Sequence, residues 1–253
     1  MEDTDVVVIG GGPSGCFAAL KLAQKNVDVT LYEEHPEIGI PSHCAGHLSI
    51  RGLKSLGIYP LPEEIVENTF KGATFYSPNC TQFSVRFEVP VTCAVNRALF
   101  DNYLSERAQN AGACVRLNSK VEKLTFYENG VQARVKNQDR TETQNAKLVL
   151  DAEGISSRLA RETGLPGPER QMIVNGVEAE VENVEGTRLD SVEVYLGSEY
   201  APGFYAWLIP KKKGTAKIGL AAKKGNPKIL LEKLMSRHPV ASEKLKNAKI
   251  VRV

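Results

Sequence analysis

The sequence has no long apolar run, no closely spaced pair of cysteines and little excess charge of either sign. The apolar run near the N-terminus, Val6 to Ile9, is too short to span a bilayer, and the residues before it are acidic where a secretory signal is basic. We therefore expect a cytosolic protein. The five cysteines contain no CxxC pair, which argues against a zinc site and a disulfide framework. A net charge of only +2 argues against nucleic-acid binding.

The composition is that of an ordinary globular protein. Hydrophobic residues make up 42% of the 253 residues and charged residues 25%, so the chain can bury a substantial core. A length of this order predicts one or two domains, and the alternation of patterns along the chain favours two.

The N-terminal residues predict a strand, a helix and a second strand in immediate succession. Asp5 to Ile9 is a buried strand, Pro13 to Lys25 has helical apolar spacing, and Val27 to Tyr32 is again a strand. The segment Gly10-Gly-Gly-Pro-Ser-Gly15 lies between the first strand and the helix and matches G-x-G-x-x-G. In this context the motif predicts a dinucleotide-binding turn.

Each position of this turn has a physical role. Gly10 permits the tight turn, Gly12 lets the backbone approach a pyrophosphate, and Gly15 lets the helix pack on the strand. The residues that open the helix, Pro13 and Ser14, place its N-terminus where it attracts the anion. Glu33 ends the second strand, where its carboxylate can accept hydrogen bonds from a ribose. Glu34 is the neighbouring alternative, or else a solvated loop charge.

The rest of the chain alternates between strand and helix patterns. Asn129-Gly130 predicts a hairpin with a two-residue type I′ turn. The further elements that we expect are strands at 73–76, 83–87, 124–127, 131–135, 148–150, 203–209, 216–222 and 249–253, and helices at 96–110, from 156 and at 229–237.

Four segments resemble one known family. Asp5 to Ala19 resembles the N-terminus of FAD-dependent enzymes with the p-hydroxybenzoate-hydroxylase-like fold. Gly39-Ile-Pro-Ser-His-Cys44-Ala45-Gly46 resembles the G-x-P-x-x-C-x-G loop of geranylgeranyl reductases, digeranylgeranylglycerophospholipid reductases among them. Tyr205-Ala-Trp207-Leu-Ile-Pro210 resembles their Y-x-W-x-x-P motif, and Arg97-Ala-Leu-Phe-Asp101 their R-x-x-F-D helix start. The resemblance covers essentially the whole chain.

The resemblance implies an α/β fold in which a Rossmann-like, GR2-type FAD-binding domain is intertwined with an antiparallel β-sheet substrate domain. We expect residues 1–66 and 92–165 in the FAD-binding domain, 67–91 and 166–248 in the substrate-binding domain, and 249–253 as the start of a return strand to the FAD domain. The family also carries a Gly-Asp-Ala-type flavin motif that this chain does not contain, so a C-terminal part is apparently lacking. Asp151-Ala-Glu153-Gly154 has Glu where the family usually has a second Asp.

The resemblance also assigns site residues. Cys44, Tyr205 and Trp207 are the expected catalytic residues, with Cys44 on the substrate side of the flavin or in a proton relay. The expected cofactor-binding residues are Gly10, Gly12, Pro13, Ser14, Gly15, Glu33, Cys44, Ala45, Gly46, Arg97, Asp151 and Gly154. Each has an ordinary structural alternative: a buried thiol for Cys44, sheet packing for the two aromatic residues, and a surface ion pair for Arg97.

The implied function is an FAD-dependent reductase that saturates carbon–carbon double bonds of geranylgeranyl chains, with NAD(P)H or a ferredoxin-like protein as electron donor. Such a protein would be a monomer in peripheral contact with the inner face of a membrane. Two alternatives stay open: an aromatic monooxygenase of the same fold, and a non-catalytic nucleotide-binding fragment. His43 and His47 could relay protons or be exposed loop residues. The lysines at 211–213, 223 and 224 could meet a phosphate headgroup or form a solvated turn.

Overall fold

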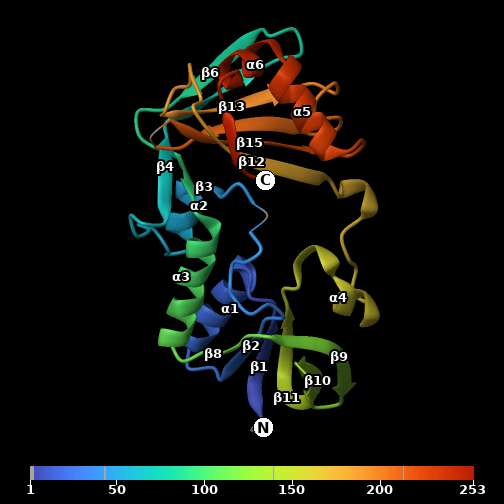
Figure 1. The fold of residues 1–253 in the computed structure, drawn as a ribbon. Coiled ribbons are helices and arrows are strands. Elements are labelled where there is room, and N and C mark those ends of the chain that lie inside the picture. The colour runs from blue at the N-terminus through green and yellow to red at the C-terminus, as the bar shows by residue number, and fades with distance from the viewer. Residues whose placement is uncertain (1–2, 43, 139, 213) are drawn as a thin grey trace. The chain divides into compact units, whose positions relative to one another are not determined.

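The computed structural model describes residues 3–42, 44–138, 140–212 and 214–253. The chain forms two compact units (Figure 1). The first contains Met1–Ser42 and Arg97–Glu169, and the second contains His43–Asn96 and Arg170–Val253.

The first unit is built on a six-stranded sheet in the order β8-β2-β1-β11-β10-β9. Its strands are β1 (Thr4–Ile9), β2 (Val29–Tyr32), β8 (Cys114–Arg116), β9 (Ser119–Tyr127), β10 (Gly130–Asn137) and β11 (Arg140–Asp151). Strands β1, β2, β8 and β11 run parallel to one another, which places their carboxyl ends at one edge of the sheet. Two helices, α1 (Pro13–Ala23) and α3 (Arg97–Asn110), pack against each other, while η1 (Gly154–Ser156) and α4 (Arg158–Glu162) follow β11.

The β9–β10 hairpin is confirmed, but its turn differs from the expected one. Tyr127 pairs with Gly130, so the loop residues are Glu128 and Asn129. Neither Asn129 nor Gly130 has a positive φ, so the type I′ prediction is wrong. Gly130 is explained by a close approach instead, because a Cβ there would lie 2.7 Å from the carbonyl oxygen of Ala146 on β11.

The second unit contains a seven-stranded sheet in the order β16-β12-β15-β14-β13-β5-β6. Its strands are β5 (Gly72–Tyr76), β6 (Gln82–Arg86), β12 (Asn175–Glu182), β13 (Ser191–Leu196), β14 (Tyr205–Pro210), β15 (Thr215–Ala222) and β16 (Lys249–Arg252). All neighbours pair antiparallel except β13 and β5, which are parallel. Helices α5 (Pro227–Arg237) and α6 (Pro239–Leu245) bury Leu231, Leu234 and Leu245 in one core with this sheet.

A three-stranded sheet completes the second unit, in the order β3-β7-β4. It consists of β3 (His47–Ser49), β4 (Val66–Phe70) and β7 (Thr92–Val95), with α2 (Ile50–Ser55) following β3 and a 3₁₀ turn, η2 (Arg170–Met172), elsewhere in the unit. Phe70 and Ala94 share a buried cluster with Val192 of β13 and Ile209 of β14.

The units divide the chain at points other than those expected from the sequence. Residues 43–66 and 92–96 belong to the second unit, because β3 and β4 both pair with β7 and this small sheet packs on the larger one. The expected return strand also differs: β16 pairs with β12 at the edge of the seven-stranded sheet instead of joining the FAD domain.

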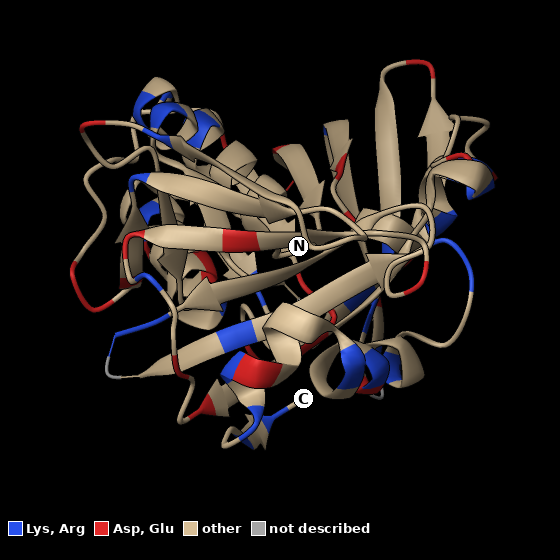
Figure 2. Cartoon of the chain, turned by 90° about the horizontal axis from the view of Figure 1, so that it is seen from above, with Lys and Arg blue, Asp and Glu red and all other residues tan. Residues whose placement is uncertain are grey.

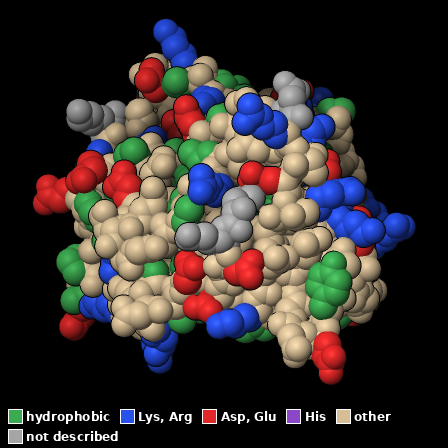
Figure 3. Space-filling model, turned by 90° about the horizontal axis from the view of Figure 1, so that it is seen from below, with side chains coloured by type: hydrophobic (Ala, Val, Ile, Leu, Met, Phe, Trp, Pro, Cys, Tyr) green, Lys and Arg blue, Asp and Glu red, His purple; other side chains and the backbone are tan. Residues whose placement is uncertain are grey.

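Charges of both signs are spread over the described elements. Basic and acidic residues both occur on strands, loops and helices (Figure 2). On the face shown in Figure 3, both signs occur together among single apolar side chains. Among the described residues, no helix is long and apolar enough to cross a membrane.

Candidate functional site

The glycine turn lies at the carboxyl end of β1, and its tight geometry is fixed by the neighbouring β11. Gly10 has φ +101°, and a Cβ there would lie 2.5 Å from the carbonyl oxygen of Ala152. A Cβ on Gly15 would collide with the carbonyl oxygen of Gly10, so glycine lets α1 pack directly on the turn. Both positions therefore need glycine for reasons internal to the fold.

Gly12 is different, because nothing in the fold itself requires glycine there. Its φ of −71° suits any residue, and a Cβ on it would meet no atom within 4 Å. It caps α1, whose next residues are Pro13, which is half-buried, and Ser14, which is exposed. The open space at a helix N-terminus fits the close approach of a pyrophosphate.

Glu33 is buried at the end of β2 and faces the glycine turn. The Gly11 N–H donates to its Oε2 at 2.6 Å and the His35 N–H donates to its Oε1 at 2.8 Å, while the His35 Nδ1 lies 2.6 Å from Oε1. Oε1 thus has two partners and Oε2 only one, so Oε2 keeps an acceptor site for a ribose hydroxyl. Glu34 instead forms an exposed ion pair with Lys120, as expected for a solvated loop charge.

The turn after β11 lies against the glycine turn. The Ala152 N–H donates to the carbonyl oxygen of Ile9 at 2.8 Å. Asp151 Oδ1 accepts the Glu153 N–H at 3.0 Å, and Glu153 Oε1 accepts the Leu159 N–H at 2.9 Å. Gly154 has φ +72°, which turns the chain into η1. The Glu153 side chain therefore ties the turn to the start of α4.

Arg97 begins α3 and forms a two-pronged ion pair with Asp101. Its Nε and Nη2 lie 3.1 and 3.0 Å from the two carboxylate oxygens, and both side chains are largely buried. Burial raises the pKa of Asp101, and the Arg97 charge opposes this. Cys16 packs nearby on α1 and donates to the Gly11 carbonyl oxygen at 3.1 Å; burial raises its pKa to about 12.

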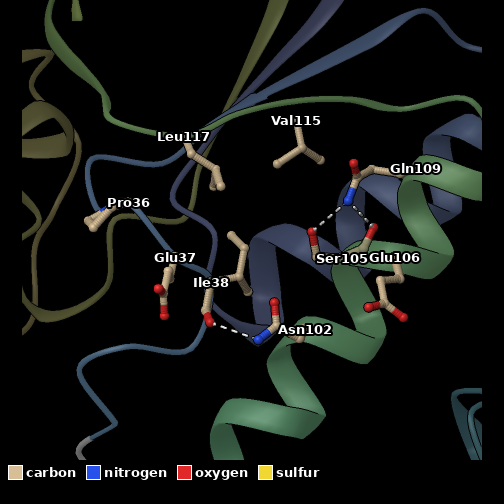
Figure 4. A pocket seen from close by; sticks show the side chains of 9 residues that line it. All are labelled: Pro36, Glu37, Ile38, Asn102, Ser105, Glu106, Gln109, Val115 and Leu117. Carbon is tan, nitrogen blue, oxygen red and sulfur yellow. Dashed lines mark hydrogen bonds between the residues drawn. The ribbon is translucent and has the colours of Figure 1, made fainter. Parts of the chain in front are cut away.

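A cavity of about 340 Å³ lies between α3, β8 and the loop after β2 (Figure 4). The Asn102 amide donates to the Ile38 carbonyl oxygen at its edge. Its remaining lining residues are Pro36, Glu37, Ser105, Glu106, Gln109, Val115 and Leu117. The carboxylates of Glu37 and Glu106 disfavour a phosphate in this cavity.

In the second unit, Tyr205 and Trp207 lie on one face of β14. Their rings meet edge to face at 6.1 Å between centroids, and Phe204 stacks on Tyr205 at 4.4 Å. Trp207 pairs with Gly219 of β15, where a Cβ would lie 2.7 Å from the indole. The indole N–H donates to Glu178 Oε2 on β12 at 2.9 Å. The aromatic face is thus anchored by a glycine and a carboxyl group that the sequence interpretation missed.

Cys44 is exposed, in contrast to the buried Cys16 and Cys93. The next residue, Ala45, packs against the same cluster as Trp207, and its carbonyl oxygen accepts a hydrogen bond from Lys217 of β15 at 3.1 Å. The structure therefore brings together, within the second unit, the cysteine loop and the aromatic strand that the sequence holds far apart.

Of the other loop and lysine residues, His47 and Lys211 have structural partners. His47 contacts Thr92 Oγ1 at 2.8 Å and meets the Phe70 ring edge to face. Lys211 is largely buried between Glu67 at 2.8 Å and Glu180 at 3.3 Å, so it fits neither a headgroup site nor a solvated turn. Lys212, Lys223 and Lys224 are exposed. His43 and Lys213 lie outside the described residues.

We expect Glu178 to make the fluorescence of Trp207 depend on pH. Burial raises the pKa of Glu178, an effect that the Trp207 hydrogen bond and the charge of Lys217 oppose and the charges of Glu180 and Glu67 reinforce. The folded state therefore keeps this proton to higher pH than the unfolded chain. The contribution of this proton to the free energy of unfolding is complete below the pKa of glutamate in the unfolded chain, about 4.3. It is lost as the pH rises through the pKa of Glu178 in the folded protein.

The measurement is the emission of this single tryptophan as a function of pH. The transition should have its midpoint above the ordinary glutamate range and disappear in Glu178→Gln. Glu180→Gln, on the same strand, is the matched control and should keep it. If the fluorescence transition persists in Glu178→Gln, it must come from another titrating group.

Three comparisons place these features among known proteins. The model of the FAD binding domain family matches residues 3–233. Digeranylgeranylglycerophospholipid reductase 1 of Methanosphaera stadtmanae is 33% identical over 93% of this chain and 59% of that protein. The corresponding reductase of Methanocaldococcus jannaschii is 33% identical over 96% of this chain and 62% of its own length. The chain thus spans about three fifths of these relatives.

Solved structures give the same fold. A geranylgeranyl bacteriochlorophyll reductase-like protein from Thermoplasma acidophilum superposes with a TM-score of 0.91 at 29% identity, covering all of this chain and 65% of that one. A flavin-dependent brominase superposes with a TM-score of 0.80 at 20% identity, covering 98% of this chain and 66% of that one. At this identity the likeness shows a shared fold and nothing more. The expected α/β fold class is confirmed, and the chain belongs to the FAD-binding-domain family of flavoproteins.

Proposed function

We propose that this chain carries the flavin and substrate sites of an FAD-dependent reductase that saturates carbon–carbon double bonds of lipid-borne prenyl chains. The observation that carries the proposal is that the cysteine loop and the aromatic strand share one buried cluster: Ala45 and Trp207 both pack against it. The similarity to digeranylgeranylglycerophospholipid reductases supports the same substrate class.

The residues of the first unit fit FAD. Gly12 and the N-terminus of α1 would receive the pyrophosphate, and Glu33 would accept from the adenosine ribose. The turn from Asp151 to Gly154, which lies against the glycine turn, would line the same site, with Arg97 at the start of α3. When bound and reduced, FAD supplies a hydride.

The residues of the second unit would handle the prenyl chain. Tyr205 and Trp207 offer an aromatic wall for an elongated apolar substrate. An isolated alkene accepts hydride poorly, so protonation of one carbon must accompany hydride addition to its neighbour, and a wall that excludes water protects the developing cation. The Cys44 thiol, which is exposed, would hold the proton on its Sγ or pass it on. Peripheral membrane contact and a nicotinamide or ferredoxin-like electron donor belong to the same proposal.

The test is saturation of a geranylgeranyl lipid by the full-length protein, loaded with FAD and chemically reduced under anaerobic conditions. Mass spectrometry should show the gain of one H₂ per double bond, together with reoxidation of the flavin absorption bands. No gain of hydrogen by any prenyl substrate would refute the proposal. Oxygen consumption coupled to NAD(P)H and an aromatic substrate would identify the monooxygenase instead.

A further inference from the structure

A buried lysine on β15 contacts the cysteine loop directly. The side chain of Lys217 is only 5% exposed. Its Nζ lies 3.1 Å from the carbonyl oxygen of Ala45, 3.3 Å from that of Val95 and 2.6 Å from Glu67 Oε2. The ammonium group donates hydrogen bonds to the two carbonyl oxygens, and its contact with Glu67 is an ion pair.

The charge of Lys217 is compensated within a small ionic cluster. Glu67 on β4 also pairs with Lys211 at 2.8 Å, and Lys211 reaches Glu180 at 3.3 Å. Burial alone would raise the pKa of Glu67, but the two lysines lower it, so the carboxylate stays charged. The cost of removing two charges from water largely offsets the attraction in a buried ion pair, so this cluster is not explained by a gain in folding stability alone.

The two carbonyl oxygens belong to segments far apart in the sequence. Ala45 directly follows Cys44, and Val95 ends β7. The Val95 N–H donates to the Gly46 carbonyl oxygen at 2.9 Å, so the loop is tied to β7 by that bond and to β15 by Lys217. The backbone beside Cys44 is therefore held by two neighbouring elements of the second unit.

We propose that Lys217 is the positioning residue of Cys44: its ammonium group fixes the backbone of the cysteine loop against the aromatic strand. The role of Cys44 in the reaction rests on the proposed function. The contacts of Lys217 with the loop backbone, which we call the lysine clamp, are a property of the second unit alone. Lys217 acts through the loop backbone and needs no contact with substrate.

Lys211 provides a matched control. It also pairs with Glu67, and removing either lysine leaves the other beside that carboxylate. Lys211→Met therefore perturbs the ionic cluster without cutting a bond to the cysteine loop. Lys217→Met removes both backbone contacts.

The experiment measures the rate at which N-ethylmaleimide alkylates Cys44 in the full-length protein, resolved by peptide mass spectrometry, with Cys114 as internal reference. We expect Lys217→Met to raise the Cys44 rate at least about fivefold, the factor that corresponds to the loss of a single one of its two hydrogen bonds to backbone oxygens. Hydrogen exchange of the amides at 44–47 should rise in parallel. Lys211→Met should leave both near the wild-type values.

An unchanged Cys44 rate in folded Lys217→Met, or an equal increase in Lys211→Met, would overturn the proposal. If Lys217→Met does not fold, Lys217→Arg replaces it in the same comparison. Arginine keeps the charge beside Glu67, but its larger head group cannot donate to both carbonyl oxygens as the compact ammonium group does. The alkylation rate needs no substrate, so failure of the clamp is distinguishable from failure of the proposed reductase. If both hold, Lys217→Met should lower kcat while the flavin spectrum stays unchanged.

Discussion

Gly12→Ala is expected to weaken FAD binding about tenfold to a hundredfold while the fold survives. The new methyl group meets no protein atom within 4 Å, so it would occupy the space in which we propose that the pyrophosphate binds. Overpacking of a fitted site costs about 1–3 kcal/mol, which sets the expected loss of affinity. Fluorescence titration of the full-length protein with FAD measures it, with the melting temperature followed in parallel.

Gly15→Ala is the contrasting variant on the same turn. Its methyl group would collide with the carbonyl oxygen of Gly10, so α1 and β1 must separate. We expect a loss of about 3 kcal/mol or more of folding stability, visible in denaturant unfolding without any cofactor. Full FAD affinity in Gly12→Ala would show that the pyrophosphate does not lie at this turn.

Cys44→Ala is expected to slow prenyl reduction by a factor of about 10² to 10⁴, the range for a lost proton-transfer group. The exposed thiol lies beside Ala45, which packs with Trp207, whereas Cys16 and Cys93 are buried with raised pKa values of about 12 and 11. Single-turnover reoxidation of reduced FAD by a geranylgeranyl lipid measures the rate. The affinity for FAD is titrated in parallel, because Cys44 is also among the residues expected to bind the cofactor.

Cys114→Ala, on the edge strand β8 of the first unit, is the control and should keep the wild-type rate. A Cys44→Ala protein that reduces its substrate at the normal rate would remove this thiol from the reaction. The proton would then have to come from another group. Glu178, with its raised pKa, would be the next residue to replace by mutation.

Local patterns were sufficient to predict the strand, glycine turn, helix and second strand that open the first unit. The glycine turn, its flanking strands and helix, and Glu33 are adjacent in sequence, so spacing alone places them together. The pairing of Tyr205 with Trp207 on one face follows from the period of a strand in the same way. Such features depend on interactions between near neighbours, which the residue pattern contains.

Only the tertiary structure could show which distant segments meet. It showed that β3, β4 and β7 form one sheet and that β16 pairs with β12; it also replaced the expected type I′ turn by a close approach of Gly130 to Ala146. Lys217 and Glu178 looked like ordinary charges of half-buried strands. Their roles depend on the register of β12, β15 and β14, and on a loop that returns to that face. Register and long-range packing are set by the whole core, so a lysine or a glutamate shows its partner only when the chain is folded.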